Sequence, residues 1–276
     1  MLLLQLSLLT GAFLFVALMV DLNNQIRGKK MKKVIIMIGI CASLFAQQTQ
    51  VVSWNRMYKP KLGKRSAFIK EVANKTKKYN SKKGTQVIRT YEVINGPNVG
   101  SFVRGGIAGG WEQFDNPPSN QQAGRDYWYK NVMPHVENAG AQKIWEILTD
   151  VSYNGTGKSG PGNLIRVRYY HLKPGASMLG LAQKLKEVVE ATKMESRVGW
   201  YKLNSGGDRS TWAVASVHDT FEDMGNDQSL WEAYEKHHGK GSLDKFMKKF
   251  GELVQSNPKA RFAEDYRYRP DMSSPE

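Results

Sequence analysis

Residues 91–114 read YEVINGPNVGSFVRGGIAGGWEQF, and residues 201–224 read YKLNSGGDRSTWAVASVHDTFEDM. The two stretches match in residue class at one constant offset of 110 positions, from Tyr91 and Tyr201 onward. In each stretch, an alternating strand pattern leads through a loop rich in Gly, Asn and Ser into a second strand pattern, which is typical of a hairpin. A constant offset of this length indicates an internal duplication, so we expect two copies of one module.

The similarity continues outward from both hairpins. A helical period precedes each hairpin, and an alternating strand precedes each helix. Each copy therefore predicts the order β-α-β-β-α-β. In the first copy we expect a strand near 52–58, a helix over 65–79, the hairpin, a helical region from Trp128 and a strand near 147–153. In the second copy we expect a strand near 166–170, a helix over 178–192, the hairpin, a helical region from Trp231 and a strand near 261–268.

A segment rich in Gly, Ser, Asn and Pro separates the two copies. It runs from Asn154 to Asn163 with the sequence NGTGKSGPGN, a composition typical of a flexible break. We therefore expect a first module over 47–153, a linker over 154–163, a second module over 164–269 and a short tail over 270–276.

A tandem pair of such modules, each with an aromatic residue and a glutamate after its third strand (Trp111-Glu112 and Phe221-Glu222), resembles the dimeric α+β barrel superfamily of ferredoxin-like folds. That superfamily includes antibiotic-monooxygenase-like, NIPSNAP-like and chlorite-dismutase-like proteins. The resemblance covers nearly all of residues 51–269 and identifies no single family. It implies an α+β protein in which two tandem ferredoxin-like modules pack as an intramolecular barrel, and hence a monomer with pseudo-twofold symmetry. It also implies that a small ligand binds between a sheet and its helices or inside the barrel.

The composition is that of a globular protein with a strong positive charge. Of 276 residues, 41% are hydrophobic, while 40 Lys and Arg against 25 Asp and Glu give a formal net charge of +15. This excludes a disordered or collagen-like chain and permits polyanionic partners. Ten of the basic residues lie between Lys59 and Lys83, where Glu71 is the one acid. Such a run is a solvated helix face or a surface that docks on an anionic cell envelope. No motif for reading nucleic acid is present, and we expect no nucleic-acid partner.

The N-terminal region predicts export. Residues 31–46, MKKVIIMIGICASLFA, have the basic start, short apolar run and small residues of a bacterial signal peptide, with cleavage expected after Ala46. Residues 1–30, which hold a second apolar stretch, are either an over-extended start of translation or a membrane anchor. Both alternatives place the remaining chain outside the cytoplasm, in the periplasm or secreted. The single cysteine, Cys41, lies within the signal, so the mature chain would have no disulfide, thiolate metal site or cysteine nucleophile.

Two arginines and two tyrosines recur at equivalent positions of the first strand. Arg56 and Tyr58 correspond to Arg168 and Tyr170, and a spacing of two places each pair on one face of its strand. A buried arginine is costly unless it is paired or bound to an anion. We therefore expect an inter-sheet cavity for a small anionic or aromatic molecule. The residues predicted to line this cavity are Arg56, Tyr58, Tyr91, Arg104, Arg168, Tyr170, Tyr201 and His218. The competing interpretation is that Glu92, Glu112 or Glu222 pairs with these arginines, or that solvent reaches them.

The reaction, if there is one, is less defined than the fold. The resemblance suggests a cofactor-independent monooxygenase-like or isomerase-like activity, in which His218 or a tyrosine would handle protons. We predict no cofactor and no metal. Haem bound by His135, His171, His218 or His238 is an alternative, although in a ferredoxin-like sheet His171 and His218 should lie at opposite ends of neighbouring strands. A non-catalytic envelope module that docks through its basic first helix is the other alternative.

Overall fold

The computed structural model describes residues 50–118, 121–225 and 228–275. The predicted signal peptide over 31–46 and the apolar segment before it lie outside these residues. No helix in the described ranges combines the length and the hydropathy that crossing a membrane requires.

The elements of the two copies follow one another in the predicted order. Module 1 is used below for the elements from β1 to β5, and module 2 for those from β7 to β10. The main elements of module 1 are β1 (Val52–Pro60), α3 (Arg65–Tyr79), β2 (Arg89–Asn95), β3 (Phe102–Gly109), α4 (Glu112–Asp115), α5 (Gln121–Tyr127), β4 (Val136–Ala139) and β5 (Lys143–Ile147), with the short turns η1 (Trp128–Val132) and η2 (Met133–His135) after α5. Those of module 2 are β7 (Leu164–His171), α6 (Leu179–Ala191), β8 (Arg197–Ser205), β9 (Thr211–His218), α7 (Phe221–Gly225), α8 (Gln228–His238), α9 (Ser242–Leu253) and β10 (Arg261–Tyr268).

Two expected elements of module 1 lie elsewhere. The strand predicted near 147–153 is divided: β5 ends at Ile147, the short 3-10 helix η3 (Thr149–Val151) follows, and the two-residue strand β6 (Tyr153–Asn154) then pairs with β8. The second helical region of module 1 begins at Gln121, seven residues before Trp128, which starts the π-helical turn η1. In module 2 the corresponding region is split into α8 and α9.

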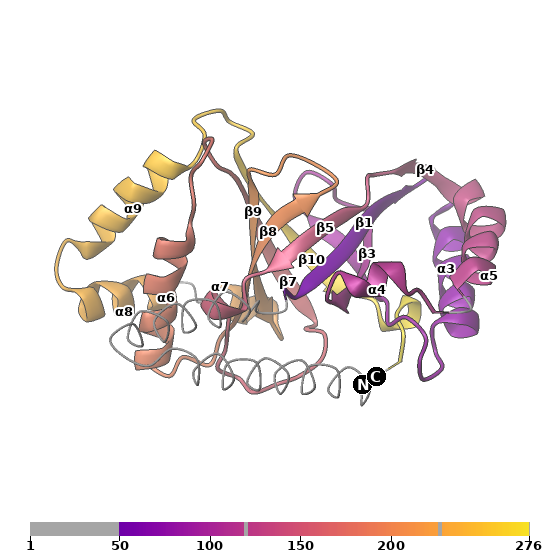
Figure 1. Cartoon of the computed structure of the whole chain (residues 1–276), viewed down its shortest axis with the longest axis horizontal. Helices are drawn as coiled ribbons and strands as arrows, with labels where there is room; N and C mark the ends of the chain where they lie inside the picture. The colour runs from indigo at the N-terminus through magenta and orange to yellow at the C-terminus, as the bar shows by residue number, and fades with distance from the viewer. Residues whose placement is uncertain (1–49, 119–120, 226–227, 276) are drawn as a thin grey trace, which may run out of the picture. The chain divides into compact units, whose positions relative to one another are not determined.

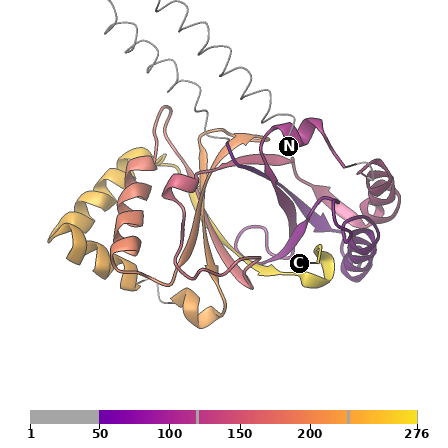
Figure 2. The ribbon, with the colours of Figure 1, turned by 60° about the horizontal axis from the view of Figure 1, so that its bottom comes forward.

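The strands form one closed antiparallel barrel. Within module 1 the order is β5-β1-β3-β2, and within module 2 it is β10-β7-β9-β8. The pairs β2–β10 and β8–β5 join the two sheets and close the ring, which Figure 2 shows in projection. This confirms the predicted fold of two ferredoxin-like modules that complete a barrel within one chain.

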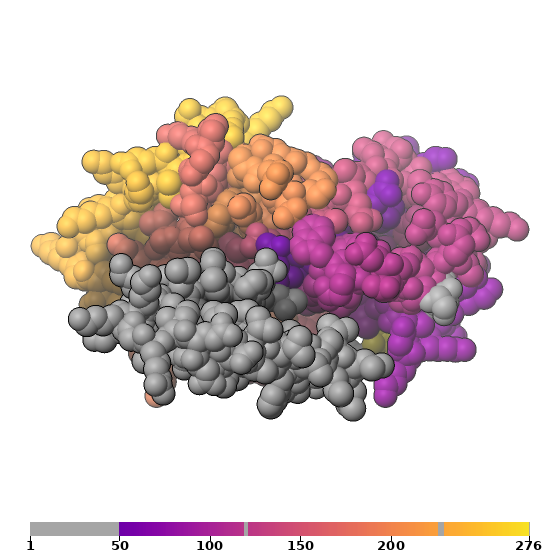
Figure 3. Space-filling model, viewed as in Figure 1, coloured from indigo at the N-terminus to yellow at the C-terminus, as the bar shows by residue number. Residues whose placement is uncertain are grey.

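Helices cover the outside of the barrel on two opposite sides. In Figure 1, α3 and α5 lie beside the sheet of module 1, and α6, α8 and α9 lie beside that of module 2. In the space-filling view, the residues of each module gather in a separate half of the face that is shown (Figure 3). Each sheet therefore has one face toward its own helices, the helix side, and one toward the barrel interior.

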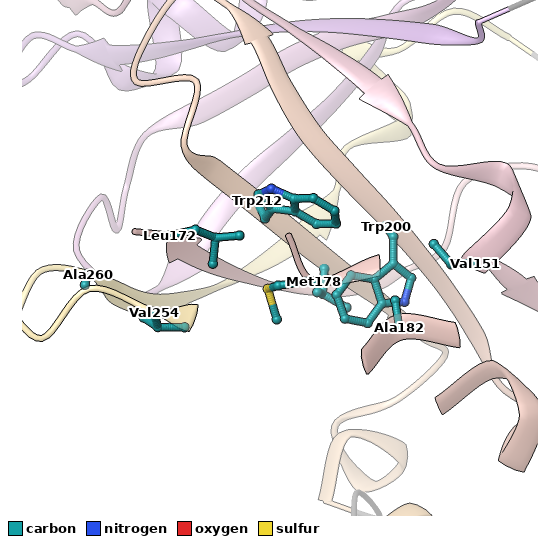
Figure 4. Close-up of a cluster of buried hydrophobic side chains, with 9 residues drawn as sticks. Val151, Leu172, Met178, Ala182, Trp200, Trp212, Val254 and Ala260 are labelled. Carbon is teal, nitrogen blue, oxygen red and sulfur yellow. The ribbon is translucent and has the colours of Figure 1, made fainter. Parts of the chain in front are cut away.

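Apolar side chains fill the barrel interior and the helix side of each module. The barrel interior holds Val93, Val103, Trp145, Val167, Tyr169, Leu203, Ala213 and Tyr266. The helix side of module 1 holds Tyr58, Phe68, Val72, Phe102, Val132, Val136 and Met272. On the helix side of module 2, Trp200 and Trp212 pack with Met178 and Ala182 of α6 and its approach (Figure 4). Alternation along β7 separates these regions, since Val167 and Tyr169 face the interior while Arg168 and Tyr170 face the helices.

The C-terminal segment returns from module 2 to module 1. After β10, the turn η4 (Pro270–Met272) places the fully buried Met272 against Phe68 and Val72 of α3. The hydroxyls of Ser273 and Ser274 then accept hydrogen bonds from the backbone amides of Thr90 and Ile88, each at 2.9 Å. Residues 269–274, named the C-terminal strap here, thus complete the core of module 1.

Candidate functional site

A large pocket lies on the helix side of module 2. Its volume is about 940 Å³, and it extends between the strands β7, β8 and β9 and the helices α6, α8 and α9. Apolar and aromatic side chains form most of its wall, including Val198 and Trp200 of β8, Val214 of β9, Leu185 and Val189 of α6, Leu230 and Trp231 of α8, and Phe246, Met247 and Phe250 of α9. A cavity of this size and character is typical of a site for a small organic molecule.

Three predicted site residues meet in this pocket. Arg168 and Tyr170 reach it from β7, and His218 reaches it from the end of β9. Arg168 donates a hydrogen bond from Nη1 to Oγ of Ser216 at 3.1 Å. The ring of Tyr170 meets Phe250 edge-on, with centroids 5.2 Å apart. A guanidinium, a phenol and an imidazole therefore enter one pocket.

Charged groups surround one end of the pocket. Lys158 forms an ion pair with Asp219, and Arg197 donates a hydrogen bond to the carbonyl of Gly160. The hydroxyl and amide of Thr220 hydrogen-bond to Asp223 and lower the pKa of its carboxyl, an effect to which His218 adds. The cationic form of His218 thus has an acidic neighbour.

The neighbouring arginine on β7 has a different role. Arg166 donates from Nε to Asp265 of β10 at 2.8 Å, and its Nη1 also reaches the carbonyl of Met224. Burial alone would raise the pKa of Asp265, but the hydrogen bonds of Arg166 and Asn95 hold it below its usual value. Arg166 is therefore a structural ion-pair partner, and Arg168 on the opposite side of Val167 donates to the hydroxyl of Ser216.

The equivalent residues of module 1 lie in a closed environment. Arg56 and Tyr58 face the helix side of that module, where Arg56 donates from Nε to the carbonyl of Gly140 at 2.6 Å. Arg104 pairs with Arg56 in the register of β1 and β3 and is 3% exposed. The aromatic rings of Phe68, Phe102 and Trp128 fill the space around them.

Tyr91 and Tyr201 belong to neither helix side. Both pack against the apolar cluster of the barrel interior, where burial raises the pKa of each phenol. The structure therefore does not place all eight predicted residues in one cavity. Three lie in the module 2 pocket, three (Arg56, Tyr58 and Arg104) on the helix side of module 1, and two in the barrel. The physical reason is that the face of the sheet that carries the Arg-x-Tyr pairs is turned toward the helices.

Glu92 does not pair with these arginines. Its carboxylate accepts hydrogen bonds from Arg65 at 2.5 Å and from Arg269 at 2.9 Å. Glu92 instead takes part in a network that connects the C-terminal strap to β2 and α3.

The histidines lie in separate places. The register pairs His171 with Thr211 and Leu164 with His218, so His171 and His218 lie at opposite ends of β7 and β9, as predicted. His171 hydrogen-bonds to Thr211, and His238 lies against the Lys184 carbonyl and the ring of Tyr234. Of the five histidines, all in the described ranges, His218 alone lines the pocket. No group of three potential metal ligands occurs in the part of the chain that the structure describes.

Several pocket residues were not singled out from the sequence. Ser216 is the hydrogen-bond partner of Arg168, and Trp231, Phe246 and Phe250 supply the aromatic wall. Ser216 lies two residues before His218 and so on the same face of β9, a signal that strand alternation carries. The spacing of Phe246 and Phe250 is that of one helix face, but it does not tell which sheet that face covers.

A network of buried polar side chains lies in the barrel interior. The phenols of Tyr169 and Tyr266 are 2.7 Å apart, and Tyr266 donates to the buried carboxylate of Glu264 at 2.7 Å. The other oxygen of Glu264 accepts from the amide and side chain of Asn98. This network is satisfied internally and ties β10 to the β2–β3 loop and β7.

The basic run of module 1 is largely exposed on α3 and the loops beside it. Lys59 pairs with Glu137 and Arg65 with Glu92, while Lys64, Lys70, Lys77 and Lys78 are exposed. Docking of this face on an anionic envelope remains a prediction.

Comparison with known proteins identifies the fold. No protein-family model and no curated protein matches the sequence. Among solved structures, a candidate monooxygenase from Fusobacterium nucleatum superposes with a TM-score of 0.52 at 12% identity, over 80% of this chain and 94% of that one. An anthrone oxidase-like protein gives 0.51 at 12% identity, over 84% and 96%. A chlorite dismutase variant from Candidatus Nitrospira defluvii gives 0.50 at 12% identity, over 82% and 94%.

These matches cover both modules, so they establish the predicted dimeric α+β barrel fold. At 12% identity they show the architecture alone.

Proposed function

We propose that the protein binds a small anionic aromatic molecule in the module 2 pocket, with Arg168 holding its negative charge. The observation that carries this proposal is the position of Arg168, whose guanidinium hydrogen-bonds to Ser216 within a cavity of about 940 Å³ walled mainly by apolar and aromatic side chains. A guanidinium in such a cavity binds a carboxylate, phenolate or sulfonate through charge-assisted hydrogen bonds, which are stronger than those between neutral groups.

The walls select for a flat apolar body. Trp200, Trp231 and Phe250 line the pocket from three different elements, and aromatic rings of this kind pack against another ring by stacking or edge contact. The ligand that fits is therefore a ring system that carries one acidic group.

The same residues support a catalytic step. His218 is the imidazole of the pocket, and the carboxylate of Asp223 lines the same pocket. With Arg168 stabilising the anion that forms, His218 would accept a proton from a bound phenol or enol. This deprotonation is common to isomerisation and to cofactor-independent oxygenation, and the monooxygenase and anthrone oxidase-like names of two matched structures are consistent with it.

The proposal is tested with 1-anilinonaphthalene-8-sulfonate, a fluorescent aromatic anion. We expect one saturable site per chain, and Arg168→Met should raise the dissociation constant about ten- to a hundredfold, because a charge-assisted hydrogen bond is lost. The measurement is a fluorescence titration, accompanied by a melting curve of each variant.

A matched control is Arg209→Met, which removes an exposed arginine of the β8–β9 turn outside the pocket. This variant should bind the dye as the unmodified protein does. Equal affinities of all three proteins would overturn the role of Arg168, and so would an Arg168→Met effect that merely follows a loss of folding.

Haem is a second candidate ligand, favoured by His218 being the histidine of the pocket. The residues fit the group: His218 would hold the iron, the aromatic walls would enclose the ring, and Lys158, Lys186 and Arg197 would meet the propionates. Haem would supply redox chemistry at its iron. Titration with hemin should then give a Soret band that His218→Ala shifts or abolishes, whereas an identical spectrum for both proteins would exclude His218 as the ligand.

A further inference from the structure

Arg104 of β3 is a buried cation with few partners. The residue is 3% exposed, and its side chain lies between the sheet of module 1 and α3. Nη2 donates to the hydroxyl of Thr76 at 2.9 Å, while Nη1 is buried and makes no hydrogen bond within the described residues. The guanidinium carbon lies 4.9 Å from the ring centroid of Trp128. The positive charge therefore meets a hydroxyl and an indole face and no carboxylate among these contacts.

Further positive groups surround this position. Arg56 is the register partner of Arg104 on β1, and Lys75 precedes Thr76 on α3. Burial and, to a smaller extent, the charge of Arg104 together lower the pKa of Lys75 to about 7. In the described part of the chain, none of the three cations has a carboxylate ion-pair partner. Arg56 instead donates to the Gly140 carbonyl, and Lys75 donates to Asn80 at 2.6 Å.

The surroundings of Arg104 differ from those of other arginines in the molecule. Arg166 has Asp265, and Arg65 and Arg269 share Glu92. They also differ from those in module 2, where the residue opposite Arg168 in the register is Val214. Module 1 thus carries a charge at a position where its copy carries an apolar side chain. Since a buried charge without a counter-charge is costly, this position calls for a counter-charge that the described residues do not supply.

We propose that module 1 binds a small inorganic anion of about the size of chloride at Nη1 of Arg104, with Arg56 and Lys75 contributing to the positive field. Tyr58 lies within range of both arginine charges, and its phenol is a further donor for the anion. The site is independent of the pocket in module 2.

Packing limits the size of the anion. Phe68, Phe102 and Val132 are fully buried around this part of module 1. Such close packing leaves room beside Nη1 of Arg104 for a single-atom anion at most, and none for a sulfate or a carboxylic acid.

The first experiment measures thermal unfolding at constant ionic strength while gluconate is replaced by chloride. The unmodified protein should show a saturable rise in melting temperature of about 3 °C, since a ligand that binds the folded state stabilises it. Arg104→Met should abolish this dependence. Lys77→Met, which removes an exposed charge on the same helix, should keep it. A melting temperature that does not respond to chloride, or that responds equally to sulfate, would overturn the proposal.

The second experiment needs no variant and therefore does not depend on whether Arg104→Met folds. Crystals of the unmodified protein grown in bromide should give an anomalous peak beside Nη1 of Arg104. A crystal that shows a water molecule or an empty position there would overturn the proposal, and neither result bears on ligand binding in module 2.

Discussion

At the scale of single residues, Arg56 and Arg168 occupy the same position in two copies of one module but have different surroundings. Arg56 is half-buried and donates to the Gly140 carbonyl, while Arg168 contacts Ser216 in an open pocket. The side chains that make the difference are on the helices. Trp128 and Phe68 fill the space in module 1, and the corresponding space of module 2 is left open between α6, α8 and α9.

Lys75 should make stability depend on pH. Its pKa is lowered to about 7 in the folded protein, so from about pH 7 to its ordinary value of 10.5 the unfolded chain binds more protons than the folded one. Stability should therefore rise with pH over this window, by about 1 kcal/mol between pH 7 and pH 8.

The measurement for Lys75 is urea unfolding at both pH values in chloride-free buffer. Lys75→Met should lose this part of the pH dependence, whereas Lys77→Met should retain it, because Lys77 is exposed. Equal pH dependence in Lys75→Met and the unmodified protein would contradict the assignment.

At the scale of elements, the C-terminal strap stabilises module 1, a role that its sequence pattern does not indicate. Met272 is fully buried against α3, and the strap supplies hydroxyls and carbonyls to β2. Met272→Ala should therefore destabilise the protein by about 2 to 4 kcal/mol, because it leaves a cavity in the core of module 1.

Chemical denaturation measures the effect of this substitution. Met247→Ala on α9 serves as the control, since that side chain is 43% exposed. A loss of stability no larger than that of the control would mean that the strap does not support module 1.

The order of elements could be predicted because it depends on local patterns. Residues 65–79 show a helical period and form α3 with the same bounds, and the constant offset between the hairpins is reproduced by β2–β3 and β8–β9. The last strand of module 1 was misplaced because Val151 and Tyr153 continue an alternation that begins in β5. The backbone amide of Leu148 still donates to the carbonyl of Trp200 on β8, and the 3-10 helix η3 then interrupts the strand before Tyr153 rejoins β8.

The candidate site could be predicted only in part. Alternation correctly places Arg168 with Tyr170, and it separates both from Tyr169. It does not say which face of the sheet meets the helices, so Tyr91 and Tyr201 were assigned to the same cavity although they lie in the barrel. Whether that face is open or filled depends on helices distant in sequence.

At the scale of the whole molecule, the two modules share one barrel. The junctions β2–β10 and β8–β5 each join a strand of one module to a strand of the other, and the apolar cluster inside the barrel draws on both. Neither sheet can open without exposing residues of its partner. We therefore expect the described part of the chain to unfold as one cooperative unit.

This expectation is tested by following denaturation with two probes. Tryptophan fluorescence reports on both modules, since Trp128 and Trp145 lie in module 1 and Trp200 and Trp212 in module 2. Fluorescence and far-ultraviolet circular dichroism should give coincident transitions. Two separated transitions would show that the modules are independent and that the barrel junctions contribute little.

The most direct test of the central claim is a crystal structure of the protein with 1-anilinonaphthalene-8-sulfonate. The account predicts one dye molecule per chain on the helix side of module 2, with its sulfonate at the guanidinium of Arg168 and its rings against Trp200, Trp231 or Phe250. A dye bound in the barrel interior or on the surface, with the module 2 pocket filled by solvent, would contradict it.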